Sequence, residues 1–183
     1  MPFKTYDIRI SVDSPANERR LDLDTFVPYF LIAISNKLTA SASRVLLCQY
    51  NCGVTDWRIL SMLAVEPEIT PGRITAAVGI DKSSVSRALR NLEKRGCVKI
   101  ARDSTHRRRQ LLSLTSDGQK LHDQIIDHML HRETLLLNGF DAEQREQLVI
   151  MLKRLLANIP PVVQWDAERA RDRSAAPSPP RGK

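Results

Sequence analysis

The stretch from Asp81 to Thr115, "DKSSVSRALRNLEKRGCVKIARDSTHRRRQLLSLT", changes its periodicity partway along, and this change restricts the possible folds. Up to Gly96 the apolar residues recur every three or four positions, which is the spacing of one helix face. Beyond Gly96 apolar and polar residues alternate, as in two paired strands, at Val98, Ile100, Leu112 and Leu114. The stretch therefore predicts a helix ended by a glycine and followed directly by a β-hairpin.

Helical periodicity also precedes this stretch. It predicts a long helix from residue 22 to about residue 49, a second one that Thr55 or Asp56 caps, and a third over 70–78. The order helix, helix, turn, helix and hairpin over residues 57–115 indicates a winged helix-turn-helix. The opening helix has more apolar surface than one small domain needs, which indicates a partner subunit.

Two more helices are expected after the hairpin. Ser116 with Gln119 resembles a capping box that begins one of them, and Asp141 with Gln144 begins the next, which Pro160 should end. The predicted domains are a partly disordered arm over 1–21, a folded domain over 22–159 and a disordered tail over 160–183.

Positive charge is concentrated in one segment. The chain of 183 residues carries a net charge of +7, yet residues 70–115 alone hold eleven Lys/Arg and three Asp/Glu, a balance of +8. Solubility does not require such a concentration, whereas a phosphate backbone selects for it. The segment therefore favours binding to a nucleic acid.

The helix over 81–96 separates its residues into two faces. At 100° per residue, one face is apolar, with Val85, Ala88, Leu89 and Leu92, and should pack on the preceding helix. The opposite face carries Ser83, Arg87, Arg90 and Lys94, with Ser86 at its edge. Such a helix can enter the major groove, where Arg87 could contact guanine or a phosphate, and its free N-terminal amides should favour phosphate.

The hairpin tip carries Arg107, Arg108 and Arg109 in succession. Because side chains alternate along an extended ribbon, the three arginines cannot all contact one target. We expect one of them to enter the adjacent minor groove and the others to lie along its walls.

Other classes of protein lack support. The sequence has no nucleophile elbow, no P-loop, no dinucleotide-binding glycine motif and no zinc-protease helix, so we predict no enzyme and no cofactor. Three cysteines make neither a disulfide framework nor a zinc site, and the histidines of residues 122–131 lack well-phased acidic partners, so no metal site is predicted. No uninterrupted apolar run approaches about 20 residues, and the first 20 residues have no apolar core, so we expect neither a membrane span nor a signal peptide.

The stretch "ITPGRITAAVGIDKSSVSRALRNLEKRGCVKIARDSTHRRRQLLSLTSDGQKL" resembles the MarR family of bacterial transcription regulators, notably in "DKSSVSR", "LEKRG", the wing arginines and "LTSDG". With the flanking helices the resemblance covers about residues 22–159. It implies a mainly α fold with a small β-hairpin wing, a DNA-binding lobe over 55–115, and a homodimer built from helices over 22–50 and 116–159.

The resemblance also implies a function and a set of contacts. Family members are usually repressors and are often released by small ligands. A homodimer places two recognition helices about 34 Å apart, so we expect a palindromic operator in double-stranded DNA. Without a signal peptide or membrane span we expect the protein in the cytoplasm. By motif match, Lys82, Ser83, Ser84, Ser86 and Arg87 would contact DNA, and Arg108 would be the wing-tip arginine. The residue analysis above adds Arg90, Arg107 and Arg109.

The signal that such a regulator would sense has several candidates. The family places organic effectors in a pocket between its first, second and fifth helices. The residues expected to line this pocket here are Tyr29, Phe30, Ser35, Trp57 and Arg58. An aromatic carboxylate could stack on the rings and bind Arg58 through its anionic group. An alternative is thiol oxidation at Cys48 and Cys52, which are spaced i, i+4. A non-specific architectural DNA-binding protein is a further alternative.

Overall fold

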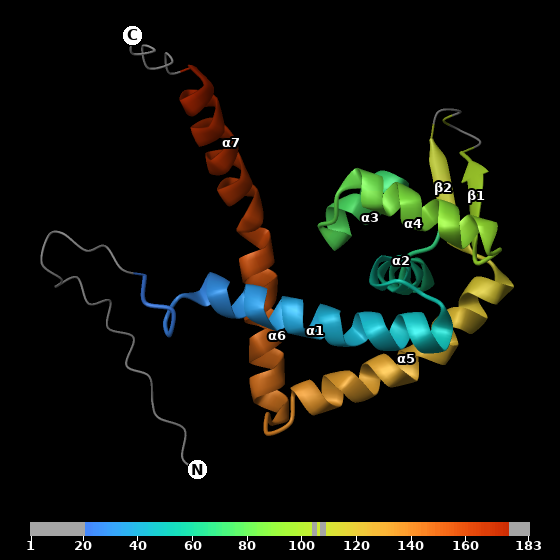
Figure 1. Cartoon of the computed structure of the whole chain (residues 1–183), viewed down its shortest axis with the longest axis horizontal. Helices are drawn as coiled ribbons and strands as arrows, with labels where there is room; N and C mark the ends of the chain where they lie inside the picture. The colour runs from blue at the N-terminus through green and yellow to red at the C-terminus, as the bar shows by residue number, and fades with distance from the viewer. Residues whose placement is uncertain (1–20, 104–105, 107–108, 176–183) are drawn as a thin grey trace, which may run out of the picture. The chain divides into compact units, whose positions relative to one another are not determined.

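A computed structural model describes residues 21–103, 106 and 109–175. In chain order the elements are α1 (Val27–Tyr50), α2 (Val54–Val65), α3 (Pro71–Val78), α4 (Lys82–Lys94), β1 (Val98–Arg102), β2 (Gln110–Leu114), α5 (Ser116–Leu136), α6 (Ala142–Ala157) and α7 (Ile159–Ala175) (Figure 1). The chain divides into two compact units, one that ends at His128 and one that begins at Met129. The predicted fold class, mainly helical with a two-stranded antiparallel wing, is confirmed.

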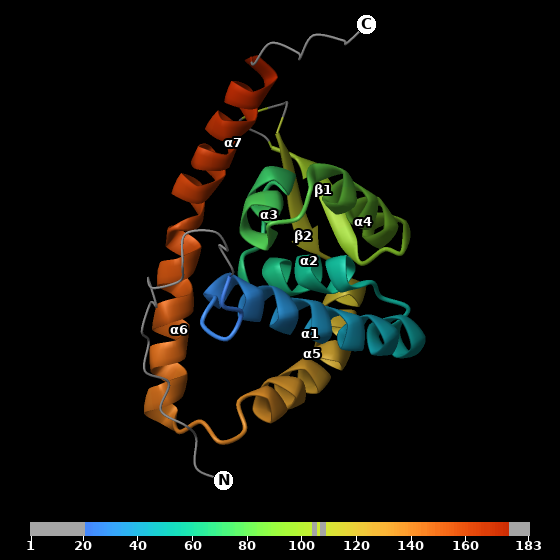
Figure 2. The ribbon, with the colours of Figure 1, turned by 60° about the vertical axis from the view of Figure 1, so that its left-hand side comes forward.

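The first unit contains the winged helix-turn-helix. The hairpin β1–β2 lies beside α3 and α4, and α2 runs beneath them (Figure 2), in contact with α3, α4 and β2. The predicted strand pairing is confirmed, because Val98 lies opposite Leu114 and Ile100 opposite Leu112. The core is formed by buried side chains from α1 to α5 and the wing, including Leu46, Ile59, Leu60, Leu63, Ile74, Val85, Leu92, Val98, Leu112 and Ile125.

Local caps explain where several helices begin. The Thr70 side chain accepts a bond from the amide of Arg73 at 3.2 Å, and Asp81 caps α4 as predicted. Two caps differ from the prediction. Gly53 precedes α2 and donates its amide to Asp56 at 3.0 Å, and Thr115, not Ser116, caps α5 by accepting from Gly118 at 3.0 Å.

The helix α1 begins later than its apolar spacing suggested. Residues before it form a turn in which the Asp22 carboxylate accepts bonds from the Asp24 amide and the Thr25 hydroxyl, both at 3.0 Å. Pro28 then lies in the first helical turn, where its missing N–H has no helical partner to lose. By length and composition alone α1 could cross a membrane, although Ser35, Asn36 and Lys37 interrupt its apolar run.

The second unit contains the end of α5 with α6 and α7. Asp141 and Gln144 form the predicted capping box at the start of α6, with bonds of 2.8 and 3.1 Å. The predicted disordered tail is wrong over residues 160–175, because α7 occupies them. Pro160 and Pro161 lie in its first turn, so they end α6 without preventing a new helix. The predicted arm over 1–20 and the tail over 176–183 lie outside the described residues.

Candidate DNA-binding surface

The helix α4 has one buried and one exposed face. Its apolar face is buried as the sequence predicts, with Leu92 fully inaccessible and Val85, Ala88 and Leu89 less than a tenth exposed. The opposite side is exposed and forms what we call the reading face, made of Lys82, Ser83, Ser86, Arg87 and Arg90. Ser84 is half-buried between the two. The structure thus brings five of the six predicted helix residues to one surface.

Asp81 organises the start of α4. Its carboxylate accepts a bond from the Ser83 hydroxyl and another from the Ser84 amide, the latter at 2.8 Å. These bonds, with Ser83 contributing most, hold the pKa of Asp81 well below its usual range. The Ser84 amide is therefore already bonded to a carboxylate, and for the other amides of this helix terminus the preference for phosphate stays a prediction.

The Arg87 side chain is held along the helix. Its Nη2 donates to the Ser84 hydroxyl at 2.9 Å, one turn closer to the N-terminus. Ser84 is thus positioned to support Arg87 more than to reach outward itself. Because the guanidinium has five donors, this one bond leaves most of them available for a bidentate contact.

A hollow of about 630 Å³ adjoins the reading face. Lys82, Ser86 and Arg90 contribute to its lining from α4, and Val85 and Leu89 give it apolar surface. The remaining lining comes from Glu93 of α4, from Pro71, Gly72, Thr75 and Ala76 of α3, and from Ile100 and Gln110 of the wing strands. The hollow places cationic and hydroxyl donors, together with one carboxylate, around a concave surface.

Backbone hydrogen bonds connect the two sides of the wing beyond the ends of β1 and β2. The Asp103 amide donates to the Arg109 carbonyl at 2.9 Å, and the Arg109 amide donates to the His106 carbonyl at 2.7 Å. The Asp103 carboxylate in turn accepts from the His106 amide at 3.3 Å. Arg109 is exposed at the start of the returning strand, whereas Arg107 and Arg108 lie outside the described residues.

The predicted effector residues fall into two groups. Trp57 and Arg58 line a hollow of about 590 Å³ between α2 and α3, together with Ser61, Met62, Val65, Glu66, Ala77 and Val78. Tyr29, Phe30 and Ser35 are exposed on α1 and are not part of that lining, although the first two rings pack edge to face at 5.7 Å. Trp57 also stacks on His122 of α5, with ring centroids 5.4 Å apart.

The cysteines do not form the expected sensor pair. The helix α1 ends at Tyr50, so Cys48 and Cys52 do not share a helical face. Cys52 is completely buried, and burial together with the nearby Asp56 charge raises the pKa of its thiol to about 12. A thiol held protonated is a poor nucleophile, which argues against the redox alternative. Within the described ranges no three His, Cys, Asp or Glu side chains cluster as a metal site.

Two polar residues at the C-terminal end of α4, Asn91 in its last turn and Arg95 just after it, were not identified from the sequence. Asn91 bonds to Asp56 of α2, and Arg95 bonds to carbonyls at the end of α1. Both contacts join positions more than 30 residues apart, so no local spacing reveals them. One indirect signal was present, because α1 has no basic residue in its own last turn to meet its C-terminal carbonyls.

A helix-turn-helix with a basic helix face and a β-hairpin wing defines a winged-helix DNA-binding protein. Residues 53–109 match the sequence profile of the MarR family. The HTH-type transcriptional regulator FarR of Neisseria gonorrhoeae is 30% identical over 116 residues, which cover 63% of this chain and 77% of FarR. The protein belongs to the MarR family and is a transcriptional regulator of that family.

Solved structures share the fold. A MarR/EmrR family transcriptional regulator from Acinetobacter sp. ADP1 is 28% identical, with a TM-score of 0.71 over 76% of this chain and 99% of that one. MepR of S. aureus, solved as a DNA complex, is 23% identical, with a TM-score of 0.65 over 74% of this chain and 98% of MepR.

Proposed function

We propose that this protein is a sequence-specific repressor that binds an inverted-repeat operator as a homodimer. The observation that carries the proposal is the separation of α4 into a buried apolar face and the exposed reading face, beside a wing that continues the basic segment. On this proposal the reading-face residues and Ser84 serve the major groove, and Arg107, Arg108 and Arg109 serve the adjacent minor groove. MepR, which shares the fold, was solved as a complex with DNA, and this supports DNA binding as the function of the fold.

The proposed homodimer rests on apolar surface that neither unit covers. In the first unit α1 exposes Val27, Phe30, Leu31 and Ile34, each more than a third accessible. In the second unit α6 has no buried residue. Helices with such faces are stabilised by packing, and a second copy of the chain supplies matching faces. Two copies would place their α4 helices about 34 Å apart, one turn of B-DNA.

The test is selection of a binding site from a random double-stranded library with the purified full chain. A repressor of this kind should enrich an inverted repeat and prefer it to random duplex by about 10³-fold or more. A preference of only a few-fold would identify an architectural protein instead. Repression itself is checked by a reporter driven from a promoter that contains the selected site.

A second proposal concerns the effector. The hollow between α2 and α3 combines an indole with the Arg58 guanidinium, which suits a small aromatic carboxylate. A contact with the effector stays a prediction for three further residues, Tyr29, Phe30 and Ser35. Benzoate serves as a probe: in a Trp165→Phe background, the remaining Trp57 should report binding by fluorescence, and Arg58→Gln should abolish that response. An unchanged response in Arg58→Gln would exclude the carboxylate contact.

The proposed location is the cytoplasm, where an operator is accessible. The proposed domain arrangement keeps 55–115 as the DNA-binding lobe, with 22–50 and 116–159 as dimerisation helices. The proposed arrangement gives no role to residues 160–175, which belong to α7.

A further inference from the structure

Arg95 follows the last residue of α4 and reaches across to another helix. Its Nη1 donates to the Asn51 carbonyl at 2.7 Å, and its Nη2 donates to the Tyr50 carbonyl at 3.3 Å. Both carbonyls lie at the end of α1, so one guanidinium holds two successive acceptors. The planar fork of arginine is suited to this paired geometry, which a lysine ammonium does not reproduce.

The end of α1 needs such a cation. The amides of Asn51 and Cys52 cap earlier carbonyls of the helix, at Leu47 and Leu46. The carbonyls of Tyr50 and Asn51 lie at the negative end of the helix dipole, and α1 has no basic residue in its last turn. Arg95, directly after α4, supplies this charge.

A second bond holds α4 one turn earlier. Asn91 donates its side-chain amide to the Asp56 carboxylate at 3.1 Å, and the same oxygen of Asp56 accepts from the Gly53 amide at 3.0 Å. Asp56 is only 7% exposed, so this bond lies in the packed junction between α2 and α4. Asn91 and Arg95 therefore attach the last turn of α4 to the connection between α1 and α2.

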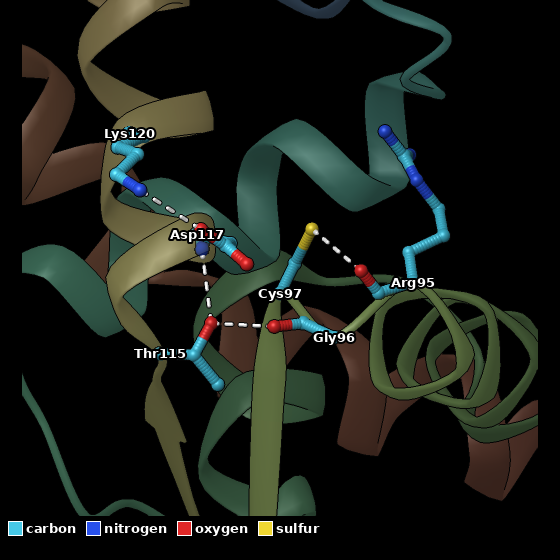
Figure 3. A network of polar contacts seen from close by, with 7 residues as sticks. Arg95, Gly96, Cys97, Thr115, Asp117 and Lys120 are labelled. Carbon is cyan, nitrogen blue, oxygen red and sulfur yellow. Dashed lines mark hydrogen bonds and ion pairs between the residues drawn. The ribbon is translucent and has the colours of Figure 1, made fainter.

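The chain beyond α4 is held as well. The Thr115 hydroxyl donates to the Gly96 carbonyl (Figure 3). The Thr115 amide donates to the Cys97 carbonyl at 3.1 Å. Gly118 at the start of α5 approaches that Cys97 carbonyl so closely that a Cβ atom would lie 1.9 Å from its oxygen. The C-terminal end of α4 thus meets α1, α2 and α5 at one junction.

We propose that Arg95 is a positioning residue for DNA recognition, which holds the C-terminal end of α4 so that the reading face meets the major groove at a fixed angle. The inference rests on the proposed function, since it requires a DNA sequence that α4 reads. Arg95 is one of the cations of the basic segment 70–115, but its guanidinium binds carbonyls within the protein and not a DNA phosphate. Asn91 supports the same placement from one turn away.

The test compares Arg95→Gln and Arg95→Lys with Arg44→Gln, which removes an exposed arginine from α1 without touching the junction. Affinity for the duplex selected from the random library and for a scrambled duplex is measured at several salt concentrations. Arg95→Gln should lower the ratio of the two affinities about tenfold, the equivalent of one charged hydrogen bond. The salt slope should stay unchanged, Arg95→Lys should recover part of the ratio, and Arg44→Gln should leave it unaltered.

Two results would overturn the proposal. A uniform loss on both duplexes with a salt slope reduced by about one would make Arg95 a phosphate contact. An equal loss on both duplexes that follows a lower unfolding midpoint would give Arg95 only a structural role.

Hydrogen exchange of the free protein separates this inference from the proposed function. In Arg95→Gln, amides in segments 50–53 and 91–96 should exchange faster than in Arg44→Gln, at a temperature where both variants are folded. Unchanged exchange would show that Arg95 does not hold α4. Failure to enrich any duplex would overturn the proposed function and the DNA role of Arg95 together, while exchange would still report whether the contact restrains the helix.

Discussion

At the scale of single residues, Gly118 packs directly against the Cys97 carbonyl. A Cβ atom at position 118 would lie 1.9 Å from the oxygen and 2.8 Å from the carbonyl carbon, and these backbone atoms cannot turn aside as a flexible side chain would. Only glycine therefore lets the start of α5 pack against the segment between α4 and β1. The missing side chain here is a packing requirement and not a helix signal, since glycine disfavours helices.

Gly118→Ala should accordingly reduce the free energy of unfolding by about 1–3 kcal/mol or more, because the added methyl overpacks the junction. Gly72→Ala is the matched control, since its Cβ would find no atom closer than 3.9 Å and alanine favours a helix. Urea unfolding at neutral pH measures both. A Gly118→Ala variant as stable as Gly72→Ala would contradict the close packing.

Asp81 gives a prediction for pH. Because its folded pKa lies below the ordinary value of 3.8, its charged form stabilises the fold above that value, and this contribution is lost as the pH falls through and below it. Asp81→Asn keeps a capping side chain but does not titrate. The unfolding midpoints of the two proteins should therefore differ at pH 7, and this difference should begin to change as the pH falls below about 4 and continue to change at lower pH. A difference that stays constant from pH 7 down to about pH 2 would exclude the carboxylate as its source.

At the scale of elements, local signals in the sequence were sufficient wherever a helix or strand is defined by its own residues. The apolar spacing and the Asp81 cap located α4, and alternation located both strands with the correct register. The same rules missed α7, because Pro160 and Pro161 end one helix and are equally acceptable in the first turn of the next. Contacts such as Arg95 to Tyr50 join segments distant in sequence, so only the fold reveals them.

The reading face yields a prediction about the element as a whole. Arg87→Ala should weaken binding to the selected duplex by about 1–3 kcal/mol and relax the preference at one base position, if Arg87 contacts a base. Ser84→Ala should produce a smaller loss in the same direction, because it removes only the hydroxyl that holds Arg87. Competition against single-base variants of the duplex measures both effects. Equal affinities in the wild type and Arg87→Ala would remove Arg87 from the proposed contacts.

At the scale of the whole molecule, the apolar faces of α1 and α6 are exposed, which supports the proposed homodimer. Every residue of α6 is at least partly accessible in the single chain, including Leu152 at 42% and Met151 at 52%. The helix α1 is similarly uncovered, and its length and composition alone would also suit a bilayer. Either a second copy of the chain or a membrane could therefore bury these apolar faces. We favour a second copy of the chain, because the proposed inverted-repeat operator requires two α4 helices.

Leu152→Asp should prevent self-association, because it places a charge in the apolar face of α6, whereas Gln147→Asp adds the same charge at an exposed polar position of that helix. Sedimentation equilibrium should give a dimer for the wild type and Gln147→Asp, and a monomer for Leu152→Asp. The monomer should bind the inverted repeat at least about a hundredfold more weakly, since it engages one half-site at a time. A wild-type protein that stays monomeric and co-sediments with phosphatidylcholine vesicles would instead assign the face of α1 to a membrane.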